Sequence, residues 1–227
     1  MNAGPAGEAG EAGEAAVARA RAEIAACGRE LLARGLLSQT AGNLSVRVGG
    51  QFCITPSAME YDRIIPADVA VIGLDGRQLG GARRPSSETP LHRAIYASRP
   101  DAGAIVHAHS PYATTLAILG EPIPAVHYMI AATGSTRVEV AGYATYGTAE
   151  LARAVADAFP APARAVLLAN HGMVAVGATL GEAASVAQTV ETLAGLYYRA
   201  LAVGTPRVLT DEQMADVLRA FAGYRAP

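Results

Sequence analysis

Residues 104–117 read AIVHAHSPYATTLA and combine a short apolar run with two closely spaced histidines. Residues 104–108 are a short apolar run that predicts a strand, and a helix is predicted directly after it at 111–119. Alternate residues of a strand point to the same face of a sheet. His107 and His109 therefore project two imidazoles from one face at the end of this strand, at a spacing that can bind one ion.

The segments on either side alternate between helical patterns and short strand-like runs. Helices are expected at 17–33, 89–98, 180–202 and 211–222, and strands at 44–48, 51–55, 69–74, 164–169 and 173–176. Regular βαβ units are absent from this order. The sequence therefore predicts an α/β fold of α+β character, in which helices flank a mixed or mainly antiparallel central sheet. Residues 1–15 form an Ala/Gly/Glu low-complexity segment expected to be a disordered tail, followed by one domain at 16–227.

Composition narrows the possible functions. The 227 residues are 51% hydrophobic, enough for a sizeable core, and carry a formal net charge of -2 without a basic stripe for nucleic acid. No apolar run approaches the roughly 18 residues of a membrane-spanning helix. The N-terminus does not resemble a signal peptide, so the cytoplasm is the expected compartment. Cys27 and Cys53 are expected to be buried thiols, because two cysteines make no disulfide framework in a chain of this length.

A third metal ligand must come from elsewhere in the chain, and His171 is the candidate. It lies in LLANHGMVAV, in a tight turn between two predicted strands, where Gly172 leaves room for close approach. Three protein ligands with one open position are the pattern of a catalytic metal site. Zinc suits three imidazoles, and manganese, cobalt and iron remain alternatives. The competing interpretation is a set of ordinary core or surface histidines.

Ser86-Ser87-Glu88 precedes the helix at 89–98. Hydroxyls and backbone N–H groups at a helix N-terminus can bind an anion, but the same residues can also form an ordinary N-terminal cap. His92 follows Glu88 by four residues, where it can support Glu88 or cap the helix.

Six motifs in this order and spacing carry a resemblance to a known family: TAGNLSVR (40–47), ITPSAMEYD (54–62), PSSETPLHRAIY (85–96), AIVHAHSPYATTLA (104–117), HYMIAATG (127–134) and NHGMVAVG (170–177). Together they resemble the class II aldolase/adducin family, from about residue 17 to about residue 224. No single motif is decisive, but six in the correct order are specific for the family.

The resemblance implies one zinc ion per subunit on His107, His109 and His171. It implies Glu88 as the catalytic acid/base, a residue that in family members can also ligate the resting metal. A phosphate pocket is implied at Gly42, Asn43, Ser57, Ala58, Ser86 and Ser87.

The resemblance also implies a homotetramer with active sites between subunits. Tyr128 resembles the tyrosine that reaches a neighbour's site as a proton donor. Tyr146 and Tyr224 fall where relatives carry aromatic residues at the aldehyde end. Two positions depart from the usual pattern: Ala58 stands where Gly is usual, and Tyr146 where Phe is common.

The expected reaction is reversible cleavage of a ketose 1-phosphate, similar to L-fuculose 1-phosphate, into dihydroxyacetone phosphate and a small aldehyde such as lactaldehyde. The family also contains sugar-acid phosphate decarboxylases, pentulose-phosphate epimerases and a dehydratase. Epimerases typically carry Asp at the position of Glu88, so Glu88 favours an aldolase or a decarboxylase. Adducin-type relatives are non-catalytic binding modules that lack the metal histidines, whereas this chain retains all of them.

Overall fold

The computed structural model describes the backbone of residues 5–224 and the side chains of residues 12–221. Eight strands form one sheet in the order β4-β3-β2-β1-β5-β8-β7-β6. Neighbouring strands pair antiparallel except β6 and β7, which pair parallel. The strands are β1 (Asn43–Val48), β2 (Gln51–Ile54), β3 (Ala70–Gly73), β4 (Gln78–Gly80), β5 (Ala104–Ala108), β6 (Val140–Ala141), β7 (Ala165–Leu168) and β8 (Gly172–Gly177).

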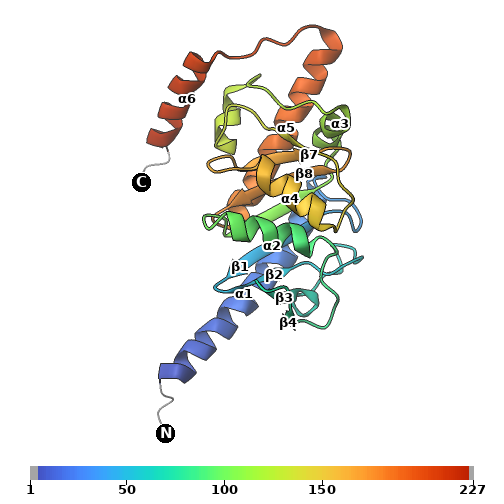
Figure 1. The fold of residues 1–227 in the computed structure, drawn as a ribbon, viewed down its shortest axis with the longest axis vertical. Helices are drawn as coiled ribbons and strands as arrows, with labels where there is room; N and C mark the ends of the chain where they lie inside the picture. The colour runs from blue at the N-terminus through green and yellow to red at the C-terminus, as the bar shows by residue number, and fades with distance from the viewer. Residues whose placement is uncertain (1–4, 225–227) are drawn as a thin grey trace.

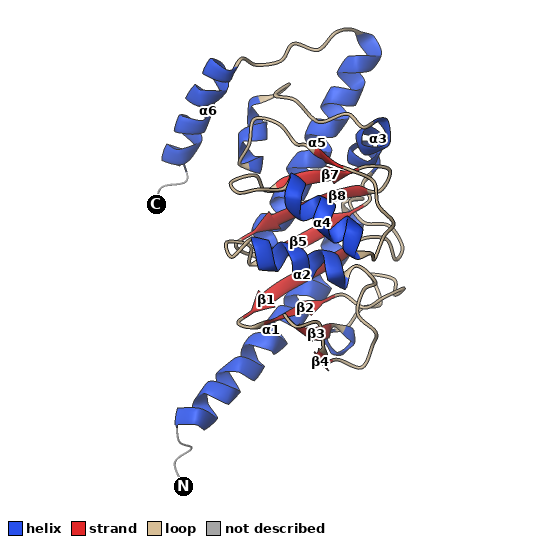
Figure 2. Cartoon of the chain, viewed as in Figure 1, coloured by secondary structure: helices blue, strands red, loops and turns tan. Residues whose placement is uncertain are grey.

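Helices cover both faces of this sheet (Figure 2). They are α1 (Pro5–Ala33), α2 (Thr89–Ser98), α3 (Pro111–Leu119), α4 (Ala149–Ala158), α5 (Leu180–Val203) and α6 (Asp211–Tyr224), with short 3-10 helices η1 (Pro66–Asp68) and η2 (Tyr128–Thr133). The expected mainly antiparallel sheet flanked by helices is confirmed. None of the described helices is long and apolar enough to cross a membrane.

The core has two layers, one on each side of the sheet. Helices α1 and α5 lie on one face of the sheet and α2 and α4 on the other (Figure 1). Side chains of α1, α3 and α5 form one layer of the core, and side chains of α2 and α4 form the other. In β5, Val106 belongs to the first layer and Ile105 to the second. Because side chains alternate along a strand, His107 lies on the same face as Ile105, under α2 and α4.

Two differences from the sequence prediction have local causes. α1 begins at Pro5 and runs through most of the Ala/Gly/Glu segment, well before the expected start at Val17. Ala and Glu favour a helix even without an apolar face, so a search for apolar periodicity starts too late. The boundary between a tail and a domain at residues 15 and 16 stays a prediction. α4, β4 and β6 were not predicted, and the two strands are only three and two residues long.

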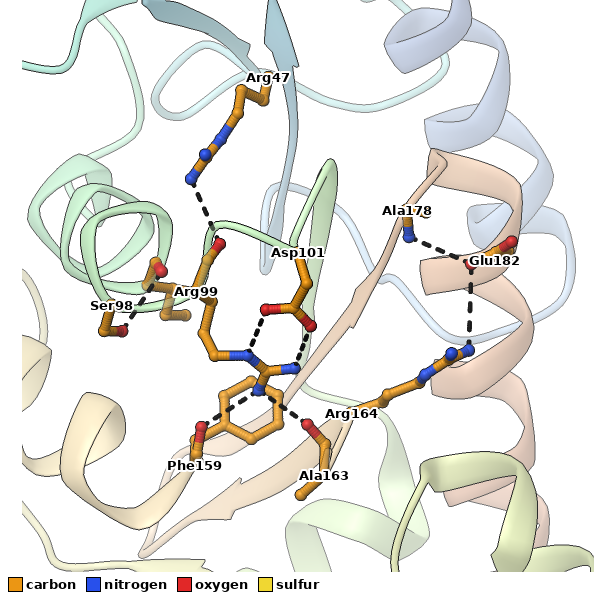
Figure 3. Close-up of polar contacts among 10 residues, drawn as sticks. Arg47, Ser98, Arg99, Asp101, Phe159, Ala163, Arg164, Ala178 and Glu182 are labelled. Carbon is orange, nitrogen blue, oxygen red and sulfur yellow. Dashed lines mark hydrogen bonds and ion pairs between the residues drawn. The ribbon is translucent and has the colours of Figure 1, made fainter. Parts of the chain in front are cut away.

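The C-terminal end of α2 is anchored by a buried arginine. Arg99 is 3% exposed; its guanidinium donates to the carbonyl oxygens of Phe159 and Ala163 and pairs with Asp101 (Figure 3). Arg47 of β1 also donates to the Arg99 carbonyl oxygen at 3.4 Å. These contacts join α2 to β1 and to the segment after α4. By fixing one end of α2, these contacts also help to hold its N-terminal end, which follows Glu88, over the sheet.

Candidate active site

Three histidines that are distant in the sequence converge at one edge of the sheet. His107 is the penultimate residue of β5, His109 directly follows the strand, and His171 lies in the turn between β7 and β8. Their ring centroids form a triangle with sides of 4.8 Å, and the angles between the ring planes are 71–76°. With Glu88 they form a group whose ligand atoms all lie within 4.8 Å of one another.

Two close contacts show what this group of side chains can bind. His107 Nδ1 lies 2.9 Å from the carbonyl oxygen of Met173, which can only accept, so Nδ1 carries the proton. The Nε2 atom of His107 lies 2.9 Å from His109 Nε2 and also 2.9 Å from Glu88 Oε2. Acceptors at these distances need a proton or a cation between them.

Glu88 is 5% exposed and lies beside the three imidazoles. Its Oε2 accepts a hydrogen bond from Asn43 Nδ2 at 2.8 Å. Its Oε1 is 3.4 Å from His171 Nε2 and has no hydrogen-bond partner among the described residues. Burial alone raises the pKa of this carboxyl, but His107, His171 and the Asn43 amide outweigh burial and lower it. Glu88 is therefore an anion near neutral pH.

Glu88 does not cap α2. Its backbone is at the N-cap position, but its side chain makes no capping hydrogen bond, and its N–H instead donates to Ser86 Oγ at 3.2 Å. The carboxylate is thus free to face the histidines, and the binding of an anion by this segment stays a prediction.

Burial, followed by the charge of His107, lowers the pKa of both His109 and His171 to about 4. Both rings are therefore neutral near pH 7, as metal ligands must be. Burial lowers the pKa of His107, but the adjacent Glu88 carboxylate outweighs burial and raises it, so His107 must release a proton when a metal binds. Three imidazoles and one carboxylate then fit a divalent transition metal, with the ligand types that zinc prefers. The hydrogen bond from His107 to Met173 is the kind of outer contact that orients metal-ligating histidines in proteins.

Local backbone geometry makes this convergence possible. Asn170 adopts a φ of 56°, the left-handed region that Asn tolerates, and so turns the chain to present His171. A Cβ on Gly172 would overlap the carbonyl oxygen of Ala108 and lie 3.0 Å from His109 Cδ2. Gly42 has a φ of 84°, and a Cβ there would lie 2.6 Å from the carbonyl oxygen of His107. Both glycines therefore let neighbouring strands approach the ligand-bearing end of β5.

A cavity of about 360 Å³ opens beside this cluster. All six residues expected to bind phosphate line it, namely Gly42, Asn43, Ser57, Ala58, Ser86 and Ser87. No arginine or lysine is among the described residues that line it, so neutral N–H and O–H groups must bind any anion there. The amide of Asn43 is already bonded to Glu88 Oε2 and His92, and therefore also holds the carboxylate.

Residues 22–198 match the family described as the Class II Aldolase and Adducin N-terminal domain. This chain belongs to the class II aldolase and adducin family. A 5-methylthioribulose-1-phosphate/5-deoxyribulose-1-phosphate aldolase of Rhodospirillum rubrum is 45% identical over 86% of this chain and 88% of that protein. An L-fuculose phosphate aldolase of Escherichia coli O6:H1 is 44% identical over 86% of this chain and 90% of its own. A solved L-fuculose 1-phosphate aldolase superposes with a TM-score of 0.86 at 43% identity, covering 90% of this chain and 96% of that one.

These matches identify a class II aldolase, and the expected family is confirmed. One departure from the usual family pattern has a structural consequence. Ala58, where Gly is usual, has a φ of 55°, so a residue with a Cβ occupies the left-handed region in the cavity wall.

The aromatic residues of this aldolase are distributed over two places. Tyr146 and Tyr143 both line the cavity, and their side chains are 66% and 67% exposed. The sequence patterns did not indicate Tyr143 as a site residue. Tyr128 is 51% exposed, stacks on His127 and lies outside the cavity lining. Tyr224 is the last residue of α6, and its side chain lies outside the part of the chain that the structure describes.

Glu191 of the aldolase holds the backbone that directly follows His109. The carboxylate of Glu191, on α5, accepts from Ser110 Oγ at 2.7 Å and from the N–H groups of Tyr112 and Ala113 at 2.9 Å each. It thus caps α3 directly after the ligand histidine. Glu191 lies 81 residues from Ser110, so no local pattern predicts this capping interaction.

Proposed function

We propose that this chain is a divalent-metal-dependent aldolase that reversibly cleaves a ketose 1-phosphate into dihydroxyacetone phosphate and a small aldehyde. The observation that carries the proposal is the position of Glu88: its carboxylate touches two of three converging imidazoles and borders a cavity lined by uncharged hydrogen-bond donors. This arrangement supports a site in which phosphate binding, metal binding and proton transfer occur side by side.

The composition supports a metal route over the alternative route to aldol chemistry. Aldolases that work through an imine need a lysine amine. All 18 basic residues of this sequence are arginines, and the 227 residues contain no lysine. Negative charge that develops on the substrate oxygens must therefore be stabilised in another way. A divalent cation on His107, His109 and His171, for which we propose zinc, supplies a Lewis acid for this purpose.

In the cleavage direction the C4 hydroxyl loses its proton and the C3–C4 bond breaks. The aldehyde leaves, and C3 of the remaining enediolate takes up a proton to give dihydroxyacetone phosphate. Glu88 is the proposed acid/base for C3, because its Oε1 is the buried oxygen without a donor. The hydroxyls of Ser57, Ser86 and Ser87 are proposed to hold the phosphate away from the reacting carbons.

Tyr128 is proposed to act in a neighbouring subunit. Its side chain is half exposed and lies away from the cavity of its own chain, as a residue that serves a second copy must. We accordingly propose a homotetramer with active sites between subunits, which sedimentation analysis tests. Because a charged sugar phosphate does not cross a membrane unaided, the cytoplasm is the proposed compartment.

The aldehyde part of the substrate is proposed to lie against Tyr143 and Tyr146 at the mouth of the cavity. The names of the relatives suggest two substrate classes, 5-substituted ribulose 1-phosphates and L-fuculose 1-phosphate. Both substrates would release dihydroxyacetone phosphate, and the aldehydes would differ. The sequence motifs at 127–134 and 143–148 favour the fuculose class.

A panel of substrates tests the function directly. Zinc-loaded protein is incubated with L-fuculose 1-phosphate, 5-deoxyribulose 1-phosphate, a pentulose 5-phosphate and a sugar-acid phosphate. We expect release of dihydroxyacetone phosphate from the ketose 1-phosphates, measured by reduction with a coupled dehydrogenase. Carbon dioxide from the sugar acid, or inversion at C4 of the pentulose, would replace the proposal with a decarboxylase or an epimerase. A protein that binds no metal and turns over nothing would support the adducin-like binding module.

A further inference from the structure

A row of buried polar side chains runs from the active site along the interface between α2 and β1. Glu88, His92 and Tyr96 follow one another at four-residue spacing on the α2 side, and Asn43 and Ser45 alternate on β1. Four residues of a helix advance about 6 Å, and two residues of a strand about 6.6 Å. The two series therefore stay in register, and each strand residue fits between two helix residues.

The contacts follow this register without a gap. Asn43 bonds to Glu88 Oε2 and to His92 Nε2, and Ser45 Oγ lies 2.6 Å from His92 Nδ1 and 2.8 Å from the hydroxyl of Tyr96. The imidazole of His92 is fully buried, and Ser45 is as well. Every polar atom of the His92 ring has a partner.

The carboxylate decides the direction of each hydrogen bond. An ionised Glu88 can only accept, so Asn43 must present its NH₂ group to it and its Oδ1 to His92. His92 Nε2 must then donate. Burial, with the charge of His107, lowers the pKa of His92 to about 3, so the ring is neutral and its Nδ1 is an acceptor. Ser45 therefore donates to Nδ1 and accepts from Tyr96.

All the donors in this row point toward the active site. Tyr96 donates to Ser45, Ser45 to His92, His92 to Asn43 and Asn43 to Glu88. Hydrogen bonds aligned in one direction polarise one another and are stronger together than apart. Asn43 is the only member besides Glu88 that reaches the cavity. The three others are therefore too remote to touch substrate.

We propose that His92 is a positioning residue, which fixes the Asn43 amide as a donor to Glu88 and through it sets the orientation of the Glu88 carboxylate. Without the His92 N–H, Asn43 can rotate about its side chain and present its oxygen to Glu88, where two acceptors would repel each other. The carboxylate would then turn away from the reacting carbon. This inference rests on the proposed acid/base role of Glu88.

Two amide variants of His92 distinguish a positioning role from a role in packing alone. In His92→Gln the amide nitrogen reaches the place of Nε2 and can still donate to Asn43. In His92→Asn the shorter side chain reaches only the place of Nδ1, so Asn43 Oδ1 loses its donor. We expect kcat of His92→Asn to fall between about 10-fold and 10²-fold below that of His92→Gln, as misplacement of a catalytic group does. KM and zinc content should stay close to wild type in both, because neither variant touches the phosphate-binding serines or the histidine cluster.

A second measurement needs no variant and no turnover. In ¹⁵N-histidine-labelled wild-type protein, the long-range ¹H–¹⁵N spectrum distinguishes the two neutral tautomers, and His92 should carry its proton on Nε2. A proton on Nδ1, or equal kcat in the two variants, would overturn the inference. If the wild-type chain cleaves no substrate of the panel, the proposed function fails, and the tautomer of His92 still decides the direction of the row.

Discussion

The Nε2 atoms of His107 and His109 face each other across 2.9 Å, with His171 closing the triangle of rings. Imidazole nitrogens at this distance repel through their lone pairs unless a proton or a cation lies between them. Removal of metal with a chelator should abolish turnover, and added zinc should restore it. Zinc at about a hundred times its dissociation constant should also stabilise the fold by about 2.7 kcal/mol, visible as a raised midpoint of thermal unfolding.

Treatment with borohydride is the chemical control for an imine mechanism in the same experiment. Borohydride in the presence of substrate traps an imine on lysine, and this sequence contains no lysine. Activity should therefore survive borohydride and disappear with chelator. The reverse pattern would contradict a metal-dependent mechanism.

Glu88→Gln tests the proposed acid/base. Gln has nearly the same shape and can still accept the Asn43 hydrogen bond, but it cannot take up a proton. We expect kcat to fall by about 10²- to 10⁴-fold, the range of general acid/base catalysis. Elemental analysis should still find zinc in the variant, since three histidines remain. A variant with normal turnover would remove Glu88 from the mechanism.

Gly172→Ala tests the turn that presents His171. The new methyl group would overlap the Ala108 carbonyl oxygen and press on His109, so zinc affinity should drop and the protein should lose stability. Gly181→Ala on α5 is the matched control, because a Cβ there meets nothing closer than 4.0 Å. Titration with zinc and thermal unfolding of both variants make the comparison. Equal zinc affinity in both would show that the turn has room to adjust.

The metal-free protein should become less stable as the pH falls from about 7 to about 5. Histidines of an unfolded chain have a pKa of about 6.5, whereas those of His109 and His171 in the folded chain are about 4. Between these values the unfolded chain binds more protons, so acid favours unfolding. The pKa of His107 is raised, so this residue alone acts in the opposite direction.

Glu88 contributes to acid sensitivity at still lower pH. Its folded pKa is lowered, so its stabilisation is complete above about 4.3 and is lost only as the pH falls further. Urea unfolding in the presence of chelator at several pH values measures both effects. His171→Asn should reduce the loss between about pH 7 and about pH 5. A stability that is constant over this range would contradict the expected pKa shifts.

Glu191→Gln should loosen the start of α3 behind His109. The carboxylate accepts three hydrogen bonds there, and the neutral amide has one acceptor oxygen in place of two. We expect a loss of about 2 kcal/mol in the free energy of unfolding, measured with urea. Glu150→Gln on α4 is the control, because that side chain is exposed and should change stability by less than about 0.5 kcal/mol.

Much of the site could be predicted because its residues carry their chemistry in short patterns. His107 and His109 are two residues apart at the end of one strand, and His171 is followed by a glycine in a turn between strands. The role of His92 could not be predicted in this way. Its spacing from Glu88 suggested direct support or a helix cap, whereas the structure connects it to Glu88 through Asn43, a residue from a different element.

Local sequence indicated most of the helices and strands, because apolar periodicity and turn residues act over a few neighbours, but it missed α4 and the short strands β4 and β6. The sequence also shows which side chains can bind a metal, and its lack of lysine excludes an imine mechanism, because both follow from residue type. Tertiary packing alone brings β1 beside β5 and α2 above both, so that Asn43 lies opposite His107 and bonds to Glu88. Such contacts depend on packing between segments distant in the chain, which no short stretch of residues encodes by itself.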